Sequence, residues 1–240
     1  MTSSKQGYAL ITGASSGIGK ATALAFGQAG IPLVLVSRSP DRLESTAAEA
    51  RKLGVAVQTY AIDLSQVEQV KPKMEAIAAQ HSIDILVNNA GMGYTGEVLT
   101  TPLDDWQRVM TLNLTSVLLC IQAILPGMRD RQQGTIINIA SIAAHQAFPG
   151  WGAYNVSKAG LVALSKTLAA EERPHGVRVV SLSPGAVNTP IWDTDTVQAD
   201  FDRTKMLTPE IVAQTILHTA LLPGQAVVEE LTLMPTAGAL

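Results

Sequence analysis

The chain has 240 residues, 47% of them hydrophobic, and a formal net charge of −3. A chain of this length can bury a substantial core, and α/β folds of this size are commonly one domain. The acidic balance argues against a nucleic-acid partner, because phosphate binding needs a concentrated basic face. The four histidines are far apart and lack ligand-like spacing, so we expect no metal site.

One domain spanning residues 1–240 is expected, because no linker, low-complexity tract or internal repeat divides the chain. Residues 1–7 lack an apolar signal segment, and no uninterrupted apolar run is long enough for a membrane span. The single cysteine, Cys120, rules out an internal disulfide and is compatible with a reducing compartment. We therefore expect a cytoplasmic protein with no membrane partner.

The first elements in chain order are a buried strand at residues 7–12, a glycine turn, and a helix at residues 20–29. Glycines let the backbone turn sharply and approach a diphosphate, whose charge then lies on the free N–H groups of the helix N-terminus. The spacing differs from the common G-x-G-x-x-G fingerprint. The order of elements nevertheless predicts a phosphate cradle, with contacts from Gly13, Ser15, Ser16, Gly17, Ile18 and Gly19.

The next strand, at residues 32–36, ends in Ser37 and Arg38. An NAD-binding fold would place Asp or Glu at this point, on the ribose 2′-hydroxyl. Here Ser37 is neutral and Arg38 can hold a 2′-phosphate, which favours NADP(H). The alternative interpretation of Arg38 is a solvated loop cation.

Polar or turn residues follow four further expected strands, which lie at residues 55–62, 83–87, 135–140 and 177–182. Those residues are Asp63, Leu64, Asn88, Asn89, Ala90, Gly91, Ser141, Ser183, Pro184 and Gly185. Ligands of open parallel sheets bind at the carboxyl ends of the strands. Each group alone could be an ordinary turn, but together they predict one ligand site.

Strand and helix alternate seven times, which is typical of an α/β fold with a Rossmann-type, doubly wound parallel sheet of seven strands and helices on both faces. The last strand is expected at residues 226–233. Three helix starts are signalled by sequence: Ser39-Pro40, a capping box from Ser65 to Glu68, and Thr208-Pro209.

Tyr154 and Lys158 lie one helical turn apart, so both project from one face if this stretch is helical. An ammonium within a few ångström favours the phenolate, so we expect Lys158 to lower the pKa of Tyr154 from about 10 towards neutrality. A general acid works best with its pKa near the working pH.

Taken together, these motifs resemble the short-chain dehydrogenase/reductase family in its single-domain form, over essentially the whole chain. The segment from Thr12 to Gly19 resembles the family's cofactor loop, and Asp63 its adenine contact. The Asn-Asn-Ala-Gly run at residues 88–91 matches the family motif at the fourth strand. The segment of Pro184, Gly185, Val187 and Thr189 resembles the one that holds the nicotinamide carboxamide, with Thr189 as the contact.

The same resemblance implies the catalytic residues. Ser141, Tyr154 and Lys158 match the family's catalytic Ser, its acid/base and the partner of that acid/base, and Asn113 falls where the catalytic Asn lies. NADPH would deliver hydride to a carbonyl that Ser141 and Tyr154 bind, with Tyr154 donating the proton. Lys158 would hydrogen-bond the nicotinamide ribose and pass protons towards Asn113. Many NADP-preferring members carry a basic residue where this chain has Ser16, so the NADP expectation depends largely on Arg38.

The substrate pocket is predicted to be mostly apolar, with a lid at residues 190–207. Its candidate residues are Met92, Tyr94, Ile142, Ala143, His145, Phe148, Trp151, Trp192 and Met206. This set suggests a hydrophobic ketone, aldehyde or secondary alcohol. We interpret His145 as a loop residue with a satisfied hydrogen bond rather than a catalytic base.

Three alternatives stay open. The first is a 3-oxoacyl-(acyl carrier protein) reductase whose Arg129 and Arg131 dock an acidic helix, although residues 190–192 depart from the pattern of those reductases. The second is an NADP-binding regulator without turnover, because fold does not fix function. The third is an α/β-hydrolase, because residues 13–17 also satisfy G-x-S-x-G, but too little chain precedes them for the usual oxyanion loop.

Assembly is predicted from two helices, at residues 103–128 and 153–170, that are apolar on more than one face. A helix that is apolar nearly all round must be buried on both sides. One side can pack on the sheet and the other on a second subunit, so we expect a homotetramer or homodimer.

Overall fold

The computed structural model describes residues 7–199 and 201–239. Seven parallel strands form one sheet in the order β3-β2-β1-β4-β5-β6-β7. The strands are β1 (Tyr8–Thr12), β2 (Leu33–Ser37), β3 (Val57–Ala61), β4 (Ile83–Asn88), β5 (Gly134–Ile139), β6 (Val177–Pro184) and β7 (Glu230–Leu233). The predicted fold class is confirmed, and the strand order reverses between β1 and β4, where such folds bind ligands.

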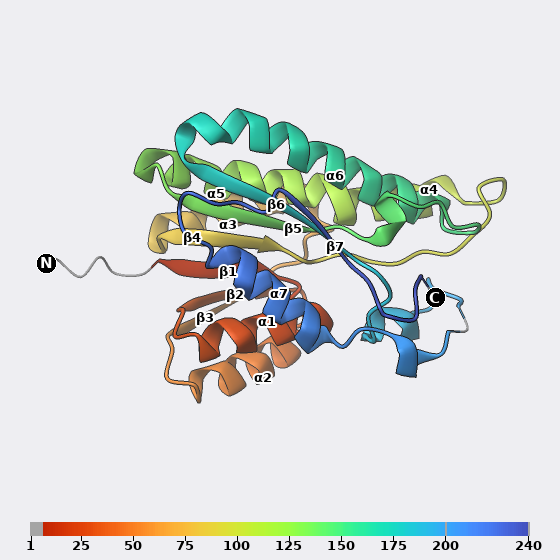
Figure 1. Cartoon of the computed structure of the whole chain (residues 1–240), viewed down its shortest axis with the longest axis horizontal. Coiled ribbons are helices and arrows are strands. Elements are labelled where there is room, and N and C mark those ends of the chain that lie inside the picture. The colour runs from red at the N-terminus through yellow and green to blue at the C-terminus, as the bar shows by residue number, and fades with distance from the viewer. Residues whose placement is uncertain (1–6, 200, 240) are drawn as a thin grey trace, which may run out of the picture.

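Helices cover both faces of this sheet (Figure 1). One face carries α1 (Gly17–Gln28), α2 (Pro40–Arg51) and α7 (Pro209–Ala220). The other carries α3 (Val67–Gln80), α4 (Leu103–Met110), α5 (Ser116–Arg131) and α6 (Gly152–Glu172). The described core accordingly forms two layers, one of which includes Phe26, Leu35 and Val212, and the other Leu86, Ile124 and Leu161.

Of the three helix starts predicted from the sequence, one has the expected side-chain cap and two do not. Thr208 caps α7 as predicted, because its hydroxyl accepts from the backbone N–H of Ile211 at 3.4 Å. Ser39 occupies the N-cap position of α2, but its side chain accepts from Arg42 instead of capping. The capping box at residues 65–68 is wrong, since α3 begins later and the Ser65 hydroxyl donates to Asp63.

The last strand is also shorter than predicted, since β7 begins at Glu230 instead of residue 226. The Arg178 guanidinium donates to the carbonyl oxygens of Leu222 at 2.7 Å and of Ala226 at 3.2 Å. The carbonyl of Ala226 thus binds a side chain, and ladder pairing with β6 begins only at Glu230.

The helical stretch Leu103–Arg131, which contains α4, a π-helical turn and α5, is long and apolar enough to cross a membrane by length and composition. Its most apolar part is nevertheless interrupted by polar residues, among them Thr111, Asn113 and Gln122, so it is not an uninterrupted apolar run. Half of its most apolar window is buried inside the protein, and a buried core helix passes the same test, so this stretch is weak evidence for a membrane span.

Candidate active site

The glycine turn after β1 leaves no room for side chains. A Cβ on Gly13 would lie 2.8 Å from the amide nitrogen of Asn89, and one on Gly19 would lie 2.3 Å from the Gly13 carbonyl oxygen. Gly13 also has a φ of +66°, which L side chains rarely adopt. The backbone therefore lies bare where α1 begins, at Gly17, one turn earlier than predicted. Such a bare N-terminus suits a diphosphate.

The Thr12 side chain ties this turn to the end of β4. Its hydroxyl accepts from the backbone N–H groups of Asn89 and Ala90, both at 3.0 Å, and donates to Val87. The Asn89 amide donates back to the Thr12 carbonyl at 3.0 Å. The cofactor candidates after β1 and after β4 are therefore brought together at the reversal of strand order.

The other cofactor candidates lie at the ends of β2 and β3. Ser37 is buried and donates to the Ser15 hydroxyl at 2.8 Å, whereas Arg38 is exposed. Asp63 accepts from the Ser65 backbone N–H at 3.0 Å. Leu64 is buried next to it. No acid stands after β2 to pair with a ribose 2′-hydroxyl.

Three of the predicted catalytic side chains meet between β5 and the start of α6. Ser141 caps a 3₁₀ turn, η2 (Ile142–Ala144), by accepting from the Ala143 N–H at 3.1 Å. Lys158 is buried, its ammonium donates to the Ile139 carbonyl at 2.8 Å, and it lies 5.7 Å from the centre of the Tyr154 ring.

Asn113 approaches this cluster from a π-helical turn, Thr111–Thr115, that joins α4 to α5. Its side chain is fully buried and clamps Met92, accepting from the backbone N–H at 2.8 Å and donating to the carbonyl at 2.9 Å. It also donates to the Ser157 hydroxyl at 3.0 Å. A Cβ on Gly91 would lie 3.2 Å from the Asn113 amide oxygen and 3.6 Å from the Lys158 ammonium. The Asn113 and Lys158 side chains therefore both lie next to Gly91.

The electrostatics of the cluster differ from the prediction. Burial raises the pKa of Tyr154, and a hydrogen bond with Ser141 only opposes that rise. Burial also lowers the pKa of Lys158 to about 8. The expected fall of the Tyr154 pKa under the influence of Lys158 is therefore wrong for this structure, because the ammonium hydrogen-bonds to a backbone carbonyl and both groups lose solvation.

The segment after β6 faces the glycine turn. A Cβ on Gly17 would lie 3.2 Å from the Thr189 side chain. Pro184 is buried, and Gly185 donates to the Leu233 carbonyl at 2.8 Å. The Val187 carbonyl accepts from the Trp192 indole at 2.7 Å. The nicotinamide-segment candidates therefore lie across from the cradle.

An aromatic row extends outward from Tyr154. The Trp151 ring lies 5.5 Å from the Tyr154 ring and 6.0 Å from Trp192, which lies 5.3 Å from Phe201, all near edge-to-face. Sequence reasoning missed Phe201, although it is an isolated aromatic in an otherwise polar stretch.

The other pocket candidates are dispersed. Ala143 and Met206 are buried, and Ile142 and Phe148 are partly exposed. Tyr94 packs in a cluster with Val109, Ala153 and the partly buried Met92. His145 turns to the sheet, where its Nε2 lies 2.9 Å from the Ser183 hydroxyl.

The expected lid is bound to the loop after β4. The backbone N–H of Thr95 donates to the Thr196 carbonyl, and the Thr196 hydroxyl donates to the Gly93 carbonyl, both at 2.8 Å. Val197 is buried, and a Cβ on Gly93 would lie 2.6 Å from it. Residues 190–199 and 201–207 therefore cover the carboxyl edge of the sheet, and residue 200 lies outside the described residues.

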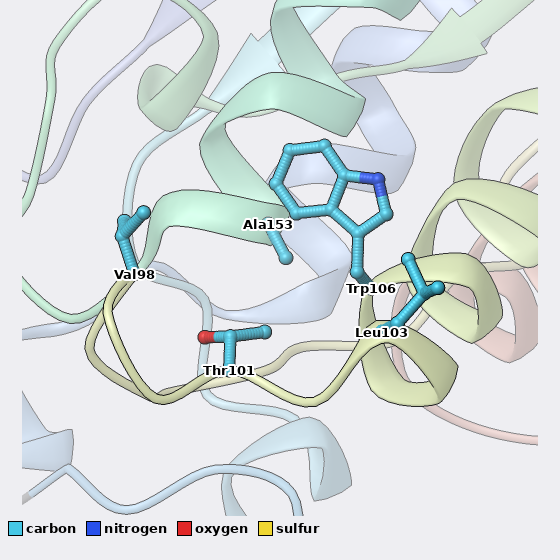
Figure 2. Close-up of a pocket in the computed structure, with 5 residues that line it drawn as sticks. All are labelled: Val98, Thr101, Leu103, Trp106 and Ala153. Carbon is cyan, nitrogen blue, oxygen red and sulfur yellow. The ribbon is translucent and has the colours of Figure 1, made fainter.

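A separate cavity of about 230 Å³ lies beside the start of α6 (Figure 2). Its lining residues, none of which is an expected site residue, are Val98, Thr101, Leu103, Trp106 and Ala153. In the described ranges, 7–199 and 201–239, no group of three or more His, Cys, Asp or Glu side chains is placed to hold a metal ion.

The two arginines proposed to dock an acidic helix are already engaged. Arg129 donates to the fully buried carboxylate of Glu172 at 2.7 Å. Arg131 donates to the Ile83 carbonyl at 2.6 Å and lies 3.3 Å from the Asp84 carboxylate. Each arginine thus already has an acidic partner within the chain, and these partners, Glu172 and Asp84, are too distant in sequence to be recognised from it.

Comparison with known proteins identifies the family. Residues 7–199 match the family profile described as short chain dehydrogenase. The chain is 34% identical over 218 residues to the 3-oxoacyl-(acyl-carrier-protein) reductase FabG of Thermotoga maritima, covering 88% of this chain and 89% of that protein. It is 36% identical over 239 residues to the sepiapterin reductase of Chlorobaculum tepidum, covering 95% of this chain and 96% of that protein.

A solved structure agrees. The alcohol dehydrogenase of the archaeon Thermococcus sibiricus, complexed with 5-hydroxy-NADP, aligns with a TM-score of 0.87 at 31% identity, covering 96% of this chain and 97% of that one. The chain therefore belongs to the short-chain dehydrogenase/reductase family and is an oxidoreductase that acts on CH–OH or C=O groups.

Proposed function

We propose that this enzyme interconverts a hydrophobic ketone or aldehyde and the corresponding alcohol with NADP(H), using Tyr154 as general acid and base. The observation that carries the proposal is the meeting of Ser141, Tyr154 and Lys158 beside the bare glycine turn. The direction of the reaction follows from the cofactor ratio.

The residues present fit NADP(H). The cradle around Gly13 and Gly19 has no side chain to obstruct a diphosphate. The hydrogen-bonded pair of Ser15 and Ser37 offers hydroxyls, and the exposed Arg38 offers a guanidinium, where NAD-binding folds place a carboxylate. The 5-hydroxy-NADP complex of the Thermococcus relative supports the same choice.

NADPH, when bound, supplies the hydride. The substrate oxygen accepts hydrogen bonds from the Ser141 and Tyr154 hydroxyls, which orient the carbonyl and stabilise the developing alkoxide. Tyr154 then donates its phenolic proton to that oxygen. Because burial raises the phenol pKa, Tyr154 holds its proton until the alkoxide forms.

Lys158 and Asn113 support this step. The Lys158 ammonium is held by the Ile139 carbonyl and lies near the Asn113 amide, with Gly91 between them. It would hydrogen-bond the nicotinamide ribose, and it would replace the proton that Tyr154 gives up with one that arrives by way of water and Asn113.

The aromatic row from Trp151 to Phe201 supports an apolar substrate, because edge-to-face rings present a large hydrophobic surface next to Tyr154. Residues 190–207 act as the lid of this pocket.

The second candidate is reduction of a 3-oxoacyl group on a carrier protein, favoured by the Thermotoga relative. The engagement of Arg129 by Glu172 and of Arg131 by Asp84 counts against it. A hydrolase is disfavoured because the Ser15 hydroxyl pairs with Ser37, which is not a base.

A substrate panel tests the proposal. NADPH oxidation is followed with apolar ketones, small ketones and acetoacetyl thioesters, for the parent and for Tyr154→Phe. We expect the apolar ketones to be reduced best, and Tyr154→Phe to bind NADPH while turnover falls by about 10² to 10⁴. A parent that binds NADPH but reduces nothing would point to the regulator, and an active Phe variant would remove Tyr154 as the acid.

Assembly and location belong to the same proposal. Leu118 on α5 and Val156 on α6 are 38% and 50% exposed, which supports a homotetramer or homodimer through these helices. A cytoplasmic location is proposed because the single cysteine, Cys120, is a free thiol, which is compatible with a reducing compartment.

A further inference from the structure

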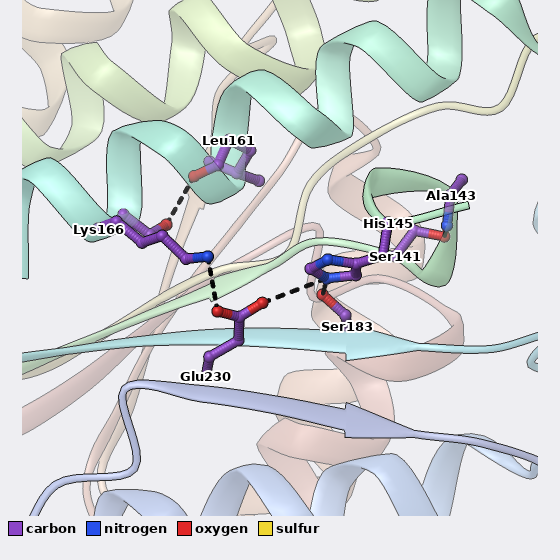
Figure 3. A network of polar contacts seen from close by, with 8 residues as sticks. Ser141, Ala143, His145, Leu161, Lys166, Ser183 and Glu230 are labelled. Atoms are coloured by element: carbon purple, nitrogen blue, oxygen red, sulfur yellow. Dashed lines mark hydrogen bonds and ion pairs between the residues drawn. The ribbon is translucent and has the colours of Figure 1, made fainter. Parts of the chain in front are cut away.

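The turn that carries Ser141 is attached to the sheet by a side chain at its other end. His145 follows η2 directly, and its Nε2 lies 2.9 Å from the hydroxyl oxygen of Ser183 in β6. Figure 3 shows the imidazole between the turn and the strand. Ser183 is fully buried and directly precedes Pro184. The contact thus joins the turn that carries Ser141 to the start of the segment that faces the cofactor site.

Hydrogen bonds within the turn connect His145 to Ser141. The Ser141 hydroxyl accepts from the Ala143 N–H at 3.1 Å, and the Ser141 carbonyl accepts from the Ala144 N–H at 2.9 Å. The His145 N–H in turn donates to the Ile142 carbonyl at 2.9 Å. These bonds close the turn on itself, so one short hydrogen-bonded unit carries both the imidazole and the Ser141 hydroxyl.

Two charged side chains, Glu230 of β7 and Lys166 of α6, extend the contact around the imidazole. The Glu230 carboxylate of β7 lies 3.6 Å from the His145 Nε2 and 2.8 Å from the Lys166 ammonium of α6 (Figure 3). Lys166 holds the pKa of Glu230 below its usual value. Lys166 also lies on the helix that carries Tyr154, so one network joins η2, β6, β7 and α6.

We propose that His145 is a positioning residue, which through Ser183 and Glu230 fixes the Ser141 hydroxyl relative to the cofactor-facing segment and to α6. A serine hydroxyl donates and accepts, so it pairs with the imidazole in either tautomer. The contact therefore orients Ser141 without moving a proton. This inference rests on the proposed role of Ser141 in binding the substrate oxygen.

The test compares His145→Phe, which keeps a ring but loses the hydrogen bond, with His145→Gln, whose amide can still pair with Ser183. The matched control is His218→Phe, at an exposed histidine in the last turn of α7. For each we measure kcat and KM for the best carbonyl, the NADPH dissociation constant by fluorescence, and the melting temperature. Hydrogen exchange of residues 141–147 is followed as a readout independent of the substrate.

A misplaced catalytic group can cost up to about 100-fold in rate, so we expect His145→Phe to lower kcat roughly ten- to hundred-fold, with NADPH affinity kept. Exchange in the turn should rise. His145→Gln should recover most of the parent kcat and most of the parent protection against exchange. His218→Phe should match the parent in both measurements. Ser183→Ala should reproduce the His145→Phe loss, and the double variant should be no worse than either, because the two residues act through one bond.

Two results would overturn the inference: a Phe variant with parent kcat and parent exchange, or a loss of kcat that only follows a loss of folded protein. Tyr154→Phe in the same assay separates this failure from that of the proposed function. If Tyr154→Phe keeps its turnover, the proposed mechanism is wrong. If Tyr154→Phe loses turnover but His145→Phe keeps it, the mechanism stands and His145 has no positioning role.

Discussion

The Lys158 ammonium lies 5.7 Å from the centre of the Tyr154 ring and donates its hydrogen bond to the Ile139 carbonyl. A cation over an aromatic face is attracted by the ring, but the hydrogen bond of this ammonium goes to a backbone carbonyl. Burial then dominates both groups, raising the pKa of Tyr154 and lowering that of Lys158. The site therefore holds Tyr154 as a protonated acid and Lys158 as a destabilised cation.

Replacing that cation should separate stability from activity. Burial lowers the Lys158 pKa from 10.5 to about 8. Below pH 8 the folded protein holds a buried charge, at a cost on the order of 3 kcal/mol, and between pH 8 and 10.5 the unfolded state binds more protons, so stability rises with pH. Lys158→Met should raise the melting temperature at pH 7 and lower both turnover and NADPH affinity.

The measurement is thermal unfolding from pH 7 to 10.5, where the advantage of the Met variant should shrink as the parent loses its proton. Lys73→Met is the control, because Lys73 is an exposed lysine on α3, away from this cluster. A Met variant that is less stable than the parent at pH 7 would contradict the argument.

The preference for NADPH over NADH should depend on Ser37 and Arg38, at the end of β2. The double change Ser37→Asp with Arg38→Gln removes the guanidinium and supplies a carboxylate for a ribose 2′-hydroxyl. Losing a charge-assisted contact typically costs 1.5–3 kcal/mol, so NADPH affinity should fall roughly ten- to hundred-fold and NADH affinity should rise. The readout is the ratio of the two dissociation constants.

Arg173→Gln is the control for this change, since Arg173 is an exposed cation paired with Glu229 away from the site. The cofactor assignment does not stand if the parent binds NADPH and NADH equally, or if the double change leaves their ratio as it was.

Features that depend on neighbouring residues could mostly be predicted from the sequence, and contacts between distant residues could not. The positive φ of Gly13 and the Thr208 cap were predictable, because each involves only neighbouring residues. The capping box at residues 65–68 failed although it is local, because Asp63 competes for the Ser65 hydroxyl. The partner of Arg129, Glu172, lies 43 residues away, so only the fold could reveal it.

The prediction of a lowered Tyr154 pKa was wrong for a related reason. The i, i+4 spacing correctly places Lys158 near the ring, but it carries no information about solvent. Desolvation is set by the whole fold around α6, and it outweighs the expected attraction.

The engagement of Arg129 predicts a structural rather than a docking role. Arg129→Met leaves the fully buried carboxylate of Glu172 without its partner, and an unpaired buried charge is strongly unfavourable. We expect a lower melting temperature and equal losses of activity with thioester and simple ketone substrates. Arg131→Met is the comparison, since Arg131 has a partly exposed partner. A selective loss of activity with a carrier-protein substrate, at unchanged stability, would restore the docking role.

Assembly should depend on the outward faces of α5 and α6. Leu118→Asp with Val156→Asp introduces charges where two apolar side chains are exposed, so an interface at these helices should weaken. We expect light scattering at micromolar concentration to report a multiple of the chain mass for the parent and a smaller assembly for the variant. Leu221→Asp, at a leucine that is 52% exposed after α7, is the control. A monomeric parent would count against the proposed assembly.

Substrate choice should depend on the indole at the lid end of the aromatic row. Trp192 contacts the rings of Trp151 and Phe201 and anchors itself through its N–H to the Val187 carbonyl. Trp192→Leu removes a large apolar surface, so kcat/KM for bulky apolar ketones should fall about ten-fold or more, while small ketones, which do not extend to the lid, should lose much less. Tyr60→Leu is the control, because that aromatic ring lies against His81 on β3, the edge strand of the sheet. Equal losses for large and small ketones would show that Trp192 supports the fold of the lid and does not contact substrate.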